Sequence, residues 1–279
     1  MITTPSSPGP SSQAARILEE GRLPQPPVNS LANPPAGGVV LGLVGGLGLA
    51  AGVFYYKAIV EACLEDGRQP RLVLVHADSQ KVMGLASRDA RLELATYLVD
   101  LLHQLRAAGA QIAAIPAFAP QVCAEDIARM TPLPLIDLIE VIRSEAKRRD
   151  LKRVAILGAG VTMRTALFSQ LPDVDVVPLP GDEEALVADV YARLVARGAQ
   201  DPAEIDLMVD IARRAVERDS LDAVIVAGTD FVHALTEDRL GVPTLDGARL
   251  HVSRIVAQMA GGVRKMSADA FSDRRGGPG

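Results

Sequence analysis

The sequence has few aromatic residues: they make up 3% of its 279 residues, and tryptophan is absent. Proteins that bind single-stranded nucleic acid stack the bases on aromatic side chains, and many carbohydrate sites also use aromatic platforms. The formal net charge is −5, and there is no dense run of lysine and arginine. Positive surface charge is the usual mark of a nucleic-acid-binding protein. We therefore expect no nucleic-acid partner.

Cysteine is also scarce. Cys63 and Cys123 are the two cysteines of the chain, and neither belongs to a CxxC motif or a Cys/His cluster. This pattern predicts neither a disulfide framework nor a metal site, and it favours a reducing, cytoplasmic location. Cys123 lies near the predicted start of a helix, where the pKa of a thiol can be lowered. We favour the commoner alternative, a partly buried and inert thiol.

The most apolar run, residues 39–56, is close to the minimum length of a membrane-spanning helix. It contains five glycines, and it continues into Lys57 and an amphipathic pattern. The segment before it lacks the basic region that precedes the apolar core of a secretory signal. We therefore expect neither a membrane span nor a signal sequence.

Residues 1–37 are rich in proline, serine, glycine and alanine, and residues 263–279 have a similar composition. Such segments bury too little apolar surface to offset the loss of chain entropy, so we predict a disordered leader and a flexible tail. Between them, short apolar runs alternate with longer amphipathic segments. The predicted strands are 39–44, 71–77, 111–116, 133–137, 153–158, 173–179, 223–228 and 242–246. The predicted helices are 49–65, 88–108, 123–130, 138–149, 162–171, 182–197, 202–218, 230–239 and 247–261.

Strands that alternate with helices indicate an α/β fold with parallel sheets covered on both faces. The two halves of the chain resemble each other. RVAILGAGVTMRTALF repeats the strand, glycine-rich turn and helix of VVLGLVGGLGLAAGVFYY, and IAAIPAF with PLID parallels VIVAGTDF with PTLD. We predict two similar Rossmann-like domains related by a pseudo-two-fold axis. The first comprises residues 38–137 and 243–262, the second 138–242, and a ligand would bind in the cleft between them.

The two glycine-rich turns are candidate ligand sites. Gly45 and Gly46 follow the first strand, and Gly160 and Thr162 follow the fifth. Backbone N–H groups at the start of a helix can bind an anion such as a carboxylate. The alternatives are a tight turn with no ligand and, for Thr162, a helix cap. A dinucleotide fingerprint requires a different glycine spacing and an acidic residue about 20 positions further on, so we disfavour a nicotinamide cofactor.

Six segments in this order resemble the aspartate/glutamate racemase superfamily: GLVGGLGLAAGVFYYKAI, LVLVHADSQKV, PLPLIDLIE, RVAILGAGVTMRTALF, LPGDEEALVADVYARL and VPTLDGARLHVSRIV. The resemblance covers residues 39–261. It implies cofactor-independent chemistry, in which one cysteine thiolate removes the α-proton of an amino acid and a second thiol protonates the opposite face. It also implies a homodimer and a small carboxylate-bearing substrate.

At both cysteine positions the sequence departs from this pattern. Pro116 stands at the first, and Gly228 at the second, followed by Thr229 and Asp230 at the Thr-Glu positions of the family. Neither proline nor glycine can transfer a proton, so two-thiol racemisation is not expected. The resemblance makes Asp230 the leading acid or base and Thr229 its neighbour in the catalytic loop, although either residue could instead cap the following helix.

The other candidate substrate-binding residues lie at strand ends or after them. Asp78 and Ser79 follow the second strand and could orient a substrate or form a turn. The resemblance places His251 near the cleft, and a core histidine is the alternative. Phe118 belongs to the apolar loop IPAFAP, which indicates a larger and greasier ligand than aspartate.

The sequence thus predicts a diverged racemase-like protein that performs cofactor-independent acid/base chemistry on a small carboxylate. Two alternatives stay open. One is a racemase-fold enzyme with another reaction, such as decarboxylation, elimination or cyclisation in a specialised pathway. The other is a homologue that binds a small acid without turnover.

Overall fold

The computed structural model describes residues 38–197, 201–231 and 235–261. The predicted disordered leader, 1–37, and the predicted flexible tail, 263–279, lie outside these residues. Within the described part of the chain, no helix is both long and apolar enough to cross a membrane.

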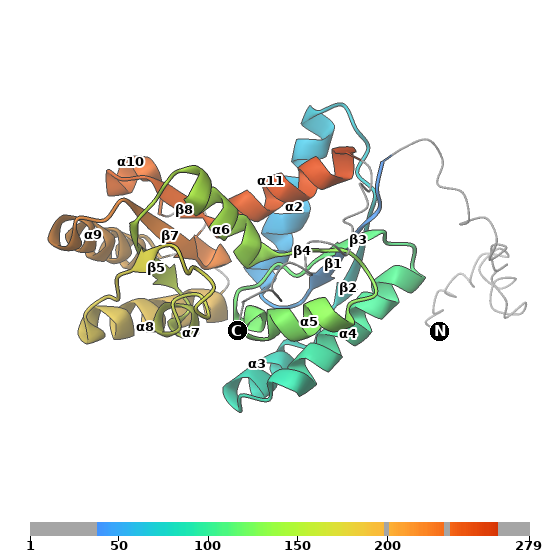
Figure 1. The fold of residues 1–279 in the computed structure, drawn as a ribbon, viewed down its shortest axis with the longest axis horizontal. Coiled ribbons are helices and arrows are strands. Elements are labelled where there is room, and N and C mark those ends of the chain that lie inside the picture. Colours follow the sequence, from blue (N-terminus) through green and yellow to red (C-terminus); the bar gives the residue numbers. More distant parts are fainter. Residues whose placement is uncertain (1–37, 198–200, 232–234, 262–279) are drawn as a thin grey trace, which may run out of the picture. The chain divides into compact units, whose positions relative to one another are not determined.

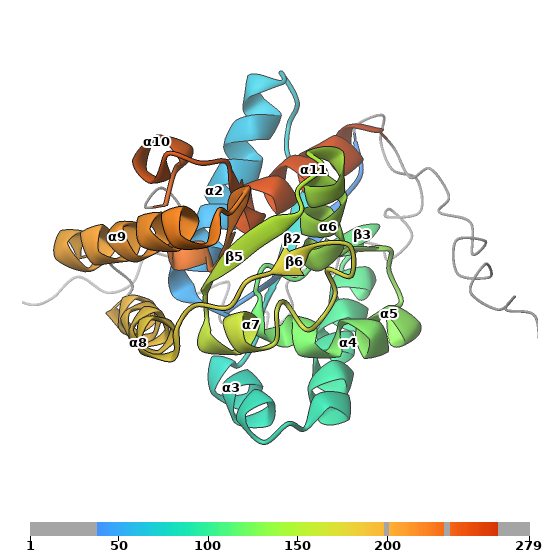
Figure 2. The same ribbon diagram turned by 60° about the vertical axis from the view of Figure 1, so that its left-hand side comes forward.

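In the part of the chain that the structure describes, eight strands form two parallel four-stranded sheets. Figures 1 and 2 show how helices surround these sheets. The first sheet has the order β2-β1-β3-β4, and the second has the order β6-β5-β7-β8. The first contains β1 (Leu41–Gly45), β2 (Leu72–His76), β3 (Ile112–Ala114) and β4 (Leu135–Ile136). The second contains β5 (Arg153–Gly158), β6 (Asp175–Val176), β7 (Ala223–Ala227) and β8 (Thr244–Asp246). The two orders are the same four-strand pattern used twice, which confirms the predicted α/β fold with two similar halves.

The helices alternate with the strands. They are α2 (Leu49–Glu65), α3 (Ser79–Ser87), α4 (Arg91–Ala107), α5 (Ala124–Met130), α6 (Leu138–Arg148), α7 (Gly160–Arg164), α8 (Gly181–Arg197), α9 (Pro202–Asp219), α10 (Glu237–Leu240) and α11 (Gly247–Gly261). Two 3₁₀ turns, η2 (Ala119–Cys123) and η3 (Thr229–Phe231), follow β3 and β7. Both faces of the central strands are covered, so β1 and β7 are buried along their whole length and read as continuous apolar runs.

Three local predictions differ from the structure. Helix α3 stands where the sequence predicted no helix, because the Asp78 side chain accepts a hydrogen bond from the Lys81 N–H and so caps a helix. Helix α7 ends at Arg164, and residues 166–169 then take positive φ angles between 47° and 60°, a left-handed conformation that ends a right-handed helix. The predicted helix 230–239 is replaced by η3 and α10, with residues 232–234 outside the described part.

Helix α11 connects the two halves. It follows β8, which pairs with β7 in the second sheet. Its buried residues Ala248, Val252, Ile255 and Met259 nevertheless pack in one apolar cluster with residues of β1 and α2. The segment 243–262, predicted to return to the first domain, therefore divides between the second sheet and the core of the first half.

The apolar cores follow the same division. One face of the first sheet packs against α3, α4 and α5, and the other against α2 and α11, as Figure 1 shows. The second half has one large cluster formed by its strands with α6, α8 and α9. Phe118, from the loop after β3, belongs to this second cluster. The strand-end loop of the first half thus inserts into the core of the second.

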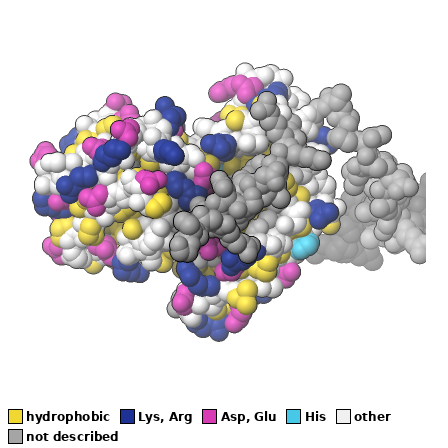
Figure 3. Space-filling model, viewed as in Figure 1, with side chains coloured by type: hydrophobic (Ala, Val, Ile, Leu, Met, Phe, Trp, Pro, Cys, Tyr) yellow, Lys and Arg dark blue, Asp and Glu magenta, His cyan; other side chains and the backbone are white. Residues whose placement is uncertain are grey.

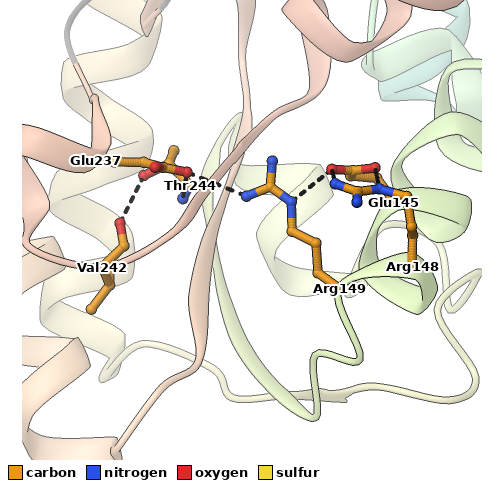
Figure 4. A network of polar contacts seen from close by, with 6 residues as sticks. All are labelled: Glu145, Arg148, Arg149, Glu237, Val242 and Thr244. Carbon is orange, nitrogen blue, oxygen red and sulfur yellow. Dashed lines mark hydrogen bonds and ion pairs between the residues drawn. The ribbon is translucent and has the colours of Figure 1, made fainter.

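A polar network stabilises the outside of the second half (Figure 4). Arg149 places Nε 2.6 Å from Glu145 Oε1 and Nη1 3.3 Å from Glu237 Oε1, which joins the end of α6 to α10. Glu237 also accepts a hydrogen bond from the Thr244 N–H of β8, at 3.1 Å. Hydrogen bonds from Arg148 and Arg149 lower the pKa of Glu145 to about 2. On the face shown in Figure 3, acidic and basic side chains are intermixed over this half.

Candidate functional site

A cavity of about 510 Å³ lies where the strand-end loops of both sheets meet. This volume is in the range of small-molecule binding sites. The carboxyl ends of parallel strands carry the ligand sites of most open α/β folds. The first half lines the cavity with Leu47, Gly48, Ala51, Ser79, Val82, Met83, Ala117, Phe118, Ala119 and Pro120. The second half lines it with Ala159, Gly160, Val161, Arg164, Ala188, Tyr191, Ala192, Val195, Ala196 and Thr229.

The polar side chains of the cavity are unevenly distributed between the halves. Among the lining residues of the first half, only Ser79 has a polar side chain. The second half provides Arg164, Tyr191 and Thr229. All other lining side chains are apolar. The cavity can therefore hold an apolar group beside a few hydrogen-bond donors, most of which come from the second half.

The first glycine-rich turn has a clear packing role. Gly46 has φ = +79°, and a Cβ at this residue would lie 2.8 Å from the His76 ring, so the turn needs glycine. Gly45 ends β1 and packs against Leu74. Leu47 and Gly48, rather than Gly45 and Gly46, line the cavity. A carboxylate-binding role for Gly45 and Gly46 stays a prediction.

The second turn contributes Gly160, which lines the cavity at the start of α7. Thr162 is fully buried, and its hydroxyl donates a hydrogen bond to the Ala159 carbonyl at 2.6 Å. It is not among the lining residues. Arg164 is, and its guanidinium lies 3.9 Å from Glu184 while its side chain is 61% exposed. An Arg164 side chain this exposed has room to reorient toward a bound anion.

Asp78 and Ser79, the two site residues predicted at the end of β2, have different roles in the structure. Ser79 lines the cavity as the first residue of α3. Asp78 caps that helix, with Oδ1 3.0 Å from the Lys81 N–H, and its own N–H donates to the Tyr97 hydroxyl at 2.8 Å. Asp78 thus orients the segment that carries Ser79.

At the end of β7, Gly228 is buried and Thr229 is 8% exposed and lines the cavity. Thr229 therefore lies at the cavity, and Gly228, which precedes it, is not among the lining residues. The backbone of Asp230 lies in η3, but its side chain is outside what the structure describes. A catalytic role for Asp230 and Thr229 stays a prediction.

At the end of β3, Phe118 is 4% exposed and lines the cavity. Its ring packs so closely on Gly247 that a Cβ there would lie 2.6 Å from Phe118 Cζ. Pro116 is buried and is not among the lining residues. The loop of the first half thus presents an aromatic ring fixed against the start of α11, and no group that transfers protons.

His251 lies in α11 and does not line the cavity. It is fully buried, with Nε2 2.8 Å from the Ile136 carbonyl and Nδ1 3.0 Å from the Tyr55 hydroxyl. A carbonyl only accepts, so Nε2 carries the proton and Nδ1 accepts from Tyr55. Burial lowers the pKa of His251 to about 4, and the ring is therefore neutral. This geometry describes a histidine that joins α11 to α2 and β4.

The cysteines lie outside the cavity lining. Cys123 is buried and donates to the Pro120 carbonyl at 3.1 Å, and burial raises its thiol pKa to about 12. Burial also raises the pKa of Cys63. Thiols with such pKa values are protonated at neutral pH, so neither is a ready nucleophile.

Sequence reasoning missed Tyr191. It lies in the middle of α8, in a regular amphipathic pattern with no local signal of a ligand site. Its place in the cavity depends on how α8 packs beside the end of β7. The one signal in the sequence is the glycine at position 228, which leaves a space beside the end of β7 that another residue can fill.

The sequence pattern of the family described as Asp/Glu/Hydantoin racemase matches residues 44–255. The matched residues are most of the chain, and they include both sheets and the strand-end loops that line the cavity. The chain belongs to the Asp/Glu/hydantoin racemase family. No curated protein sequence matches the chain.

Solved structures with the same fold include a candidate Asp/Glu racemase from Yersinia pestis, at a TM-score of 0.70 and 19% identity over 78% of this chain and 98% of the other. An aspartate racemase homologue from Pyrococcus horikoshii has a TM-score of 0.67 and 20% identity, over 78% and 97%. A variant of arylmalonate decarboxylase has a TM-score of 0.51 and 17% identity, over 80% and 94%. At these identities the likeness shows the fold.

Proposed function

We propose that this protein binds a small carboxylic acid with an apolar substituent and promotes cofactor-independent proton transfer at the carbon next to the carboxylate. The composition of the cavity supports this most strongly. Apolar side chains from both halves surround a space of about 510 Å³, and a few hydrogen-bond donors face it. A free amino acid such as aspartate is polar throughout and would leave most of this lining unmatched.

The proposal assigns a role to each polar group. The hydroxyls of Ser79 and Thr229 and the backbone N–H groups near Gly160 donate to the carboxylate. Arg164 balances its charge. Asp230 is the acid or base, since a carboxylate next to a desolvated substrate has its pKa raised toward neutral pH. Phe118 packs against the apolar substituent.

The asymmetry of the lining favours a particular reaction within this class. Racemisation moves protons on both faces of one carbon, so it needs a proton-transfer group on each side. The loop of the first half offers Ala117, Phe118, Ala119 and Pro120, and none of these can transfer a proton. Decarboxylation or elimination needs a proton on one face only. Arylmalonate decarboxylase has a similar fold, and decarboxylation of an apolar malonate is therefore our second candidate.

Isotope exchange tests the proposal. The protein is incubated in D₂O with 2-phenylpropanoate and, separately, with aspartate, and α-deuteration is followed by NMR. A parallel reaction with phenylmalonate follows the release of CO₂. We expect turnover of an aryl acid and none of aspartate, and at least a hundredfold loss in Asp230→Asn.

Three other results would change the assignment. Exchange of aspartate alone would contradict the apolar-substituent proposal. A rise in melting temperature with the aryl acids but no turnover would indicate a binding protein instead of an enzyme. Full activity of Asp230→Asn would remove Asp230 from the mechanism. The homodimer implied by the family is tested separately by sedimentation.

A further inference from the structure

The space beside Gly228 is occupied by another residue. A Cβ added at Gly228 would overlap Tyr191 Cε2 and would lie 3.0 Å from Cζ, the ring carbon that bears the hydroxyl. Real Cβ atoms do not approach other atoms this closely, and a ring of a packed helix has little freedom to yield. The ring of Tyr191 and a side chain at position 228 therefore cannot both occupy the space at the end of β7.

Neighbouring side chains hold Tyr191 in this place. Helix α8 packs against η3, and the Tyr191 ring lies 5.2 Å from the Phe231 ring at an interplanar angle of 58°. Tyr191 is half-buried, and it lines the same cavity as Thr229. An aromatic pair of this geometry orients both rings. The ring of Tyr191 thus has a fixed position next to the strand end.

We propose that Tyr191 replaces the side chain absent at position 228: its ring closes the β7 end of the cavity, and its hydroxyl donates a hydrogen bond to the carboxylate of the ligand. The ligand part of this inference rests on the proposed function. The chemistry of the side chain suits the place, because tyrosine combines a large apolar surface with one polar end. Donation to an ionised carboxylate is stronger than donation to a neutral acceptor.

The position of the ring is tested without any ligand. We compare the melting temperatures of the wild type, Gly228→Ala, Tyr191→Ala and the double variant. Overpacking by the new methyl group should lower the melting temperature of Gly228→Ala by about 5 °C. When Tyr191 is already alanine, the same methyl group should lower the melting temperature by less than about 1 °C, because the space beside position 228 is then open. Gly52→Ala in α2, where a Cβ meets nothing within 4 Å, is the matched control. An equal loss in both backgrounds would overturn the steric part.

The hydroxyl is tested with Tyr191→Phe, which keeps the ring. The probes are phenylacetate and benzylamine, which present similar rings with opposite charges. We expect about tenfold weaker binding of phenylacetate to Tyr191→Phe and no binding of benzylamine to either protein. Equal phenylacetate affinity in wild type and Tyr191→Phe would reduce Tyr191 to a space-filling residue and overturn the ligand role.

The size of the cavity gives a second readout. Tyr191→Ala should gain measurable binding of 2-naphthylacetate, a larger acid, because the β7 end of the cavity is opened. No gain would contradict the closing role of the ring. If the wild-type protein binds no carboxylate probe, the proposed function fails and the ligand role of Tyr191 fails with it. The melting-temperature cycle still decides the steric part by itself.

Discussion

The two halves of the molecule share a strand order and differ at the cavity. Each half has a glycine-rich turn after its central strand and a loop after the next strand of its sheet. The first half provides mainly apolar side chains there, and the second provides Arg164, Tyr191 and Thr229. A repeated backbone therefore does not imply a repeated chemistry. In this chain both halves contribute apolar side chains to the cavity, and the second half contributes three of its four polar side chains.

The largest effect should come from the glycines that end the central strands, Gly45 in β1 and Gly158 in β5. A Cβ at Gly158 would overlap the backbone carbonyl of Ala227 and lie 3.1 Å from its Cα, so nothing can yield without distorting the sheet. A Cβ at Gly45 would meet the Leu74 side chain at 3.0 Å, and this exposed leucine can shift. We expect Gly158→Ala to lower the free energy of unfolding by about 4 kcal/mol and Gly45→Ala by about 1 kcal/mol.

Urea denaturation of the two variants measures this difference. Equal losses would mean that the strand ends of the two halves are packed equally tightly, contrary to their geometry.

A second contrast concerns the helices that follow the outer strands. Asp137 begins α6 and Asp246 begins α11, and each aspartate accepts a hydrogen bond from a backbone N–H of its helix. Five residues further on, α6 carries Ile142 and α11 carries His251. Only the second position can titrate. The pKa of His251 is about 4 in the folded protein and about 6.5 in the unfolded chain. The neutral, buried ring therefore makes its full contribution to the free energy of unfolding above pH 6.5.

As the pH falls from 6.5 to 4, the unfolded chain takes up a proton that the buried ring does not accept. The free energy of unfolding should fall by about 3 kcal/mol over this window from His251 alone. Urea denaturation at pH 7, 6 and 5 measures the fall. The double variant Tyr55→Phe, His251→Leu should have a flatter profile, since it removes the titrating ring. The same slope in both proteins would assign the acid sensitivity to other residues.

A third prediction concerns ligand binding. Thr229→Val removes a hydroxyl from the polar side of the cavity while it keeps the side-chain shape. We expect about tenfold weaker binding of phenylacetate, the usual cost of one hydrogen bond to a charged group. Thr244→Val in β8 is the control, because Thr244 is equally buried and its hydroxyl bonds the Val242 carbonyl, outside the cavity lining. Isothermal titration compares the variants, and an effect as large in Thr244→Val would indicate a general loss of structure.

The smallest effect should come from the ion pairs outside the cavity. Glu145→Gln weakens the network of Arg148 and Arg149 (Figure 4) and should lower the free energy of unfolding by about 1 kcal/mol at neutral pH. Since the pKa of Glu145 is lowered to about 2, its contribution is lost as the pH falls from about 4.5 to 2. In the first half, Lys57 and Glu61 form an exposed pair at 3.7 Å, and Glu61→Gln should change stability by less than about 0.5 kcal/mol. Equal losses measured by denaturation would contradict this ranking.

The sequence predicted the positions of every strand found in the described residues, because apolar runs between turn residues are a strong signal when both faces of a sheet are buried. It was less informative where two local structures compete. Asp78 and Ser79 are equally compatible with a turn and a capped helix. The amphipathic pattern of residues 165–171 continues past the point where the backbone becomes left-handed.

The candidate site was predictable only where it lies on strand-end loops. Ser79, Phe118, Gly160 and Thr229 were expected at the cleft, and all four line the cavity. Tyr191 was not expected, because its role depends on the packing of a helix against a distant strand end. From the sequence, the glycine at position 228 indicated only that a functional side chain is lost. In the structure, the ring of Tyr191 from α8 occupies the space that this side chain would fill.

The path of α11 has a consequence for synthesis of the chain. The strands of the first sheet leave the ribosome before those of the second. One apolar face of this sheet packs against α2 and is completed by Ala248, Val252, Ile255 and Met259, which follow the strands of both sheets in the sequence. The strands of the second sheet come from one continuous stretch of the chain that ends with β8, directly before α11. The half that emerges first is therefore completed by a helix that emerges after both sheets, and until α11 is made the part of the first sheet that it covers is exposed to aggregation.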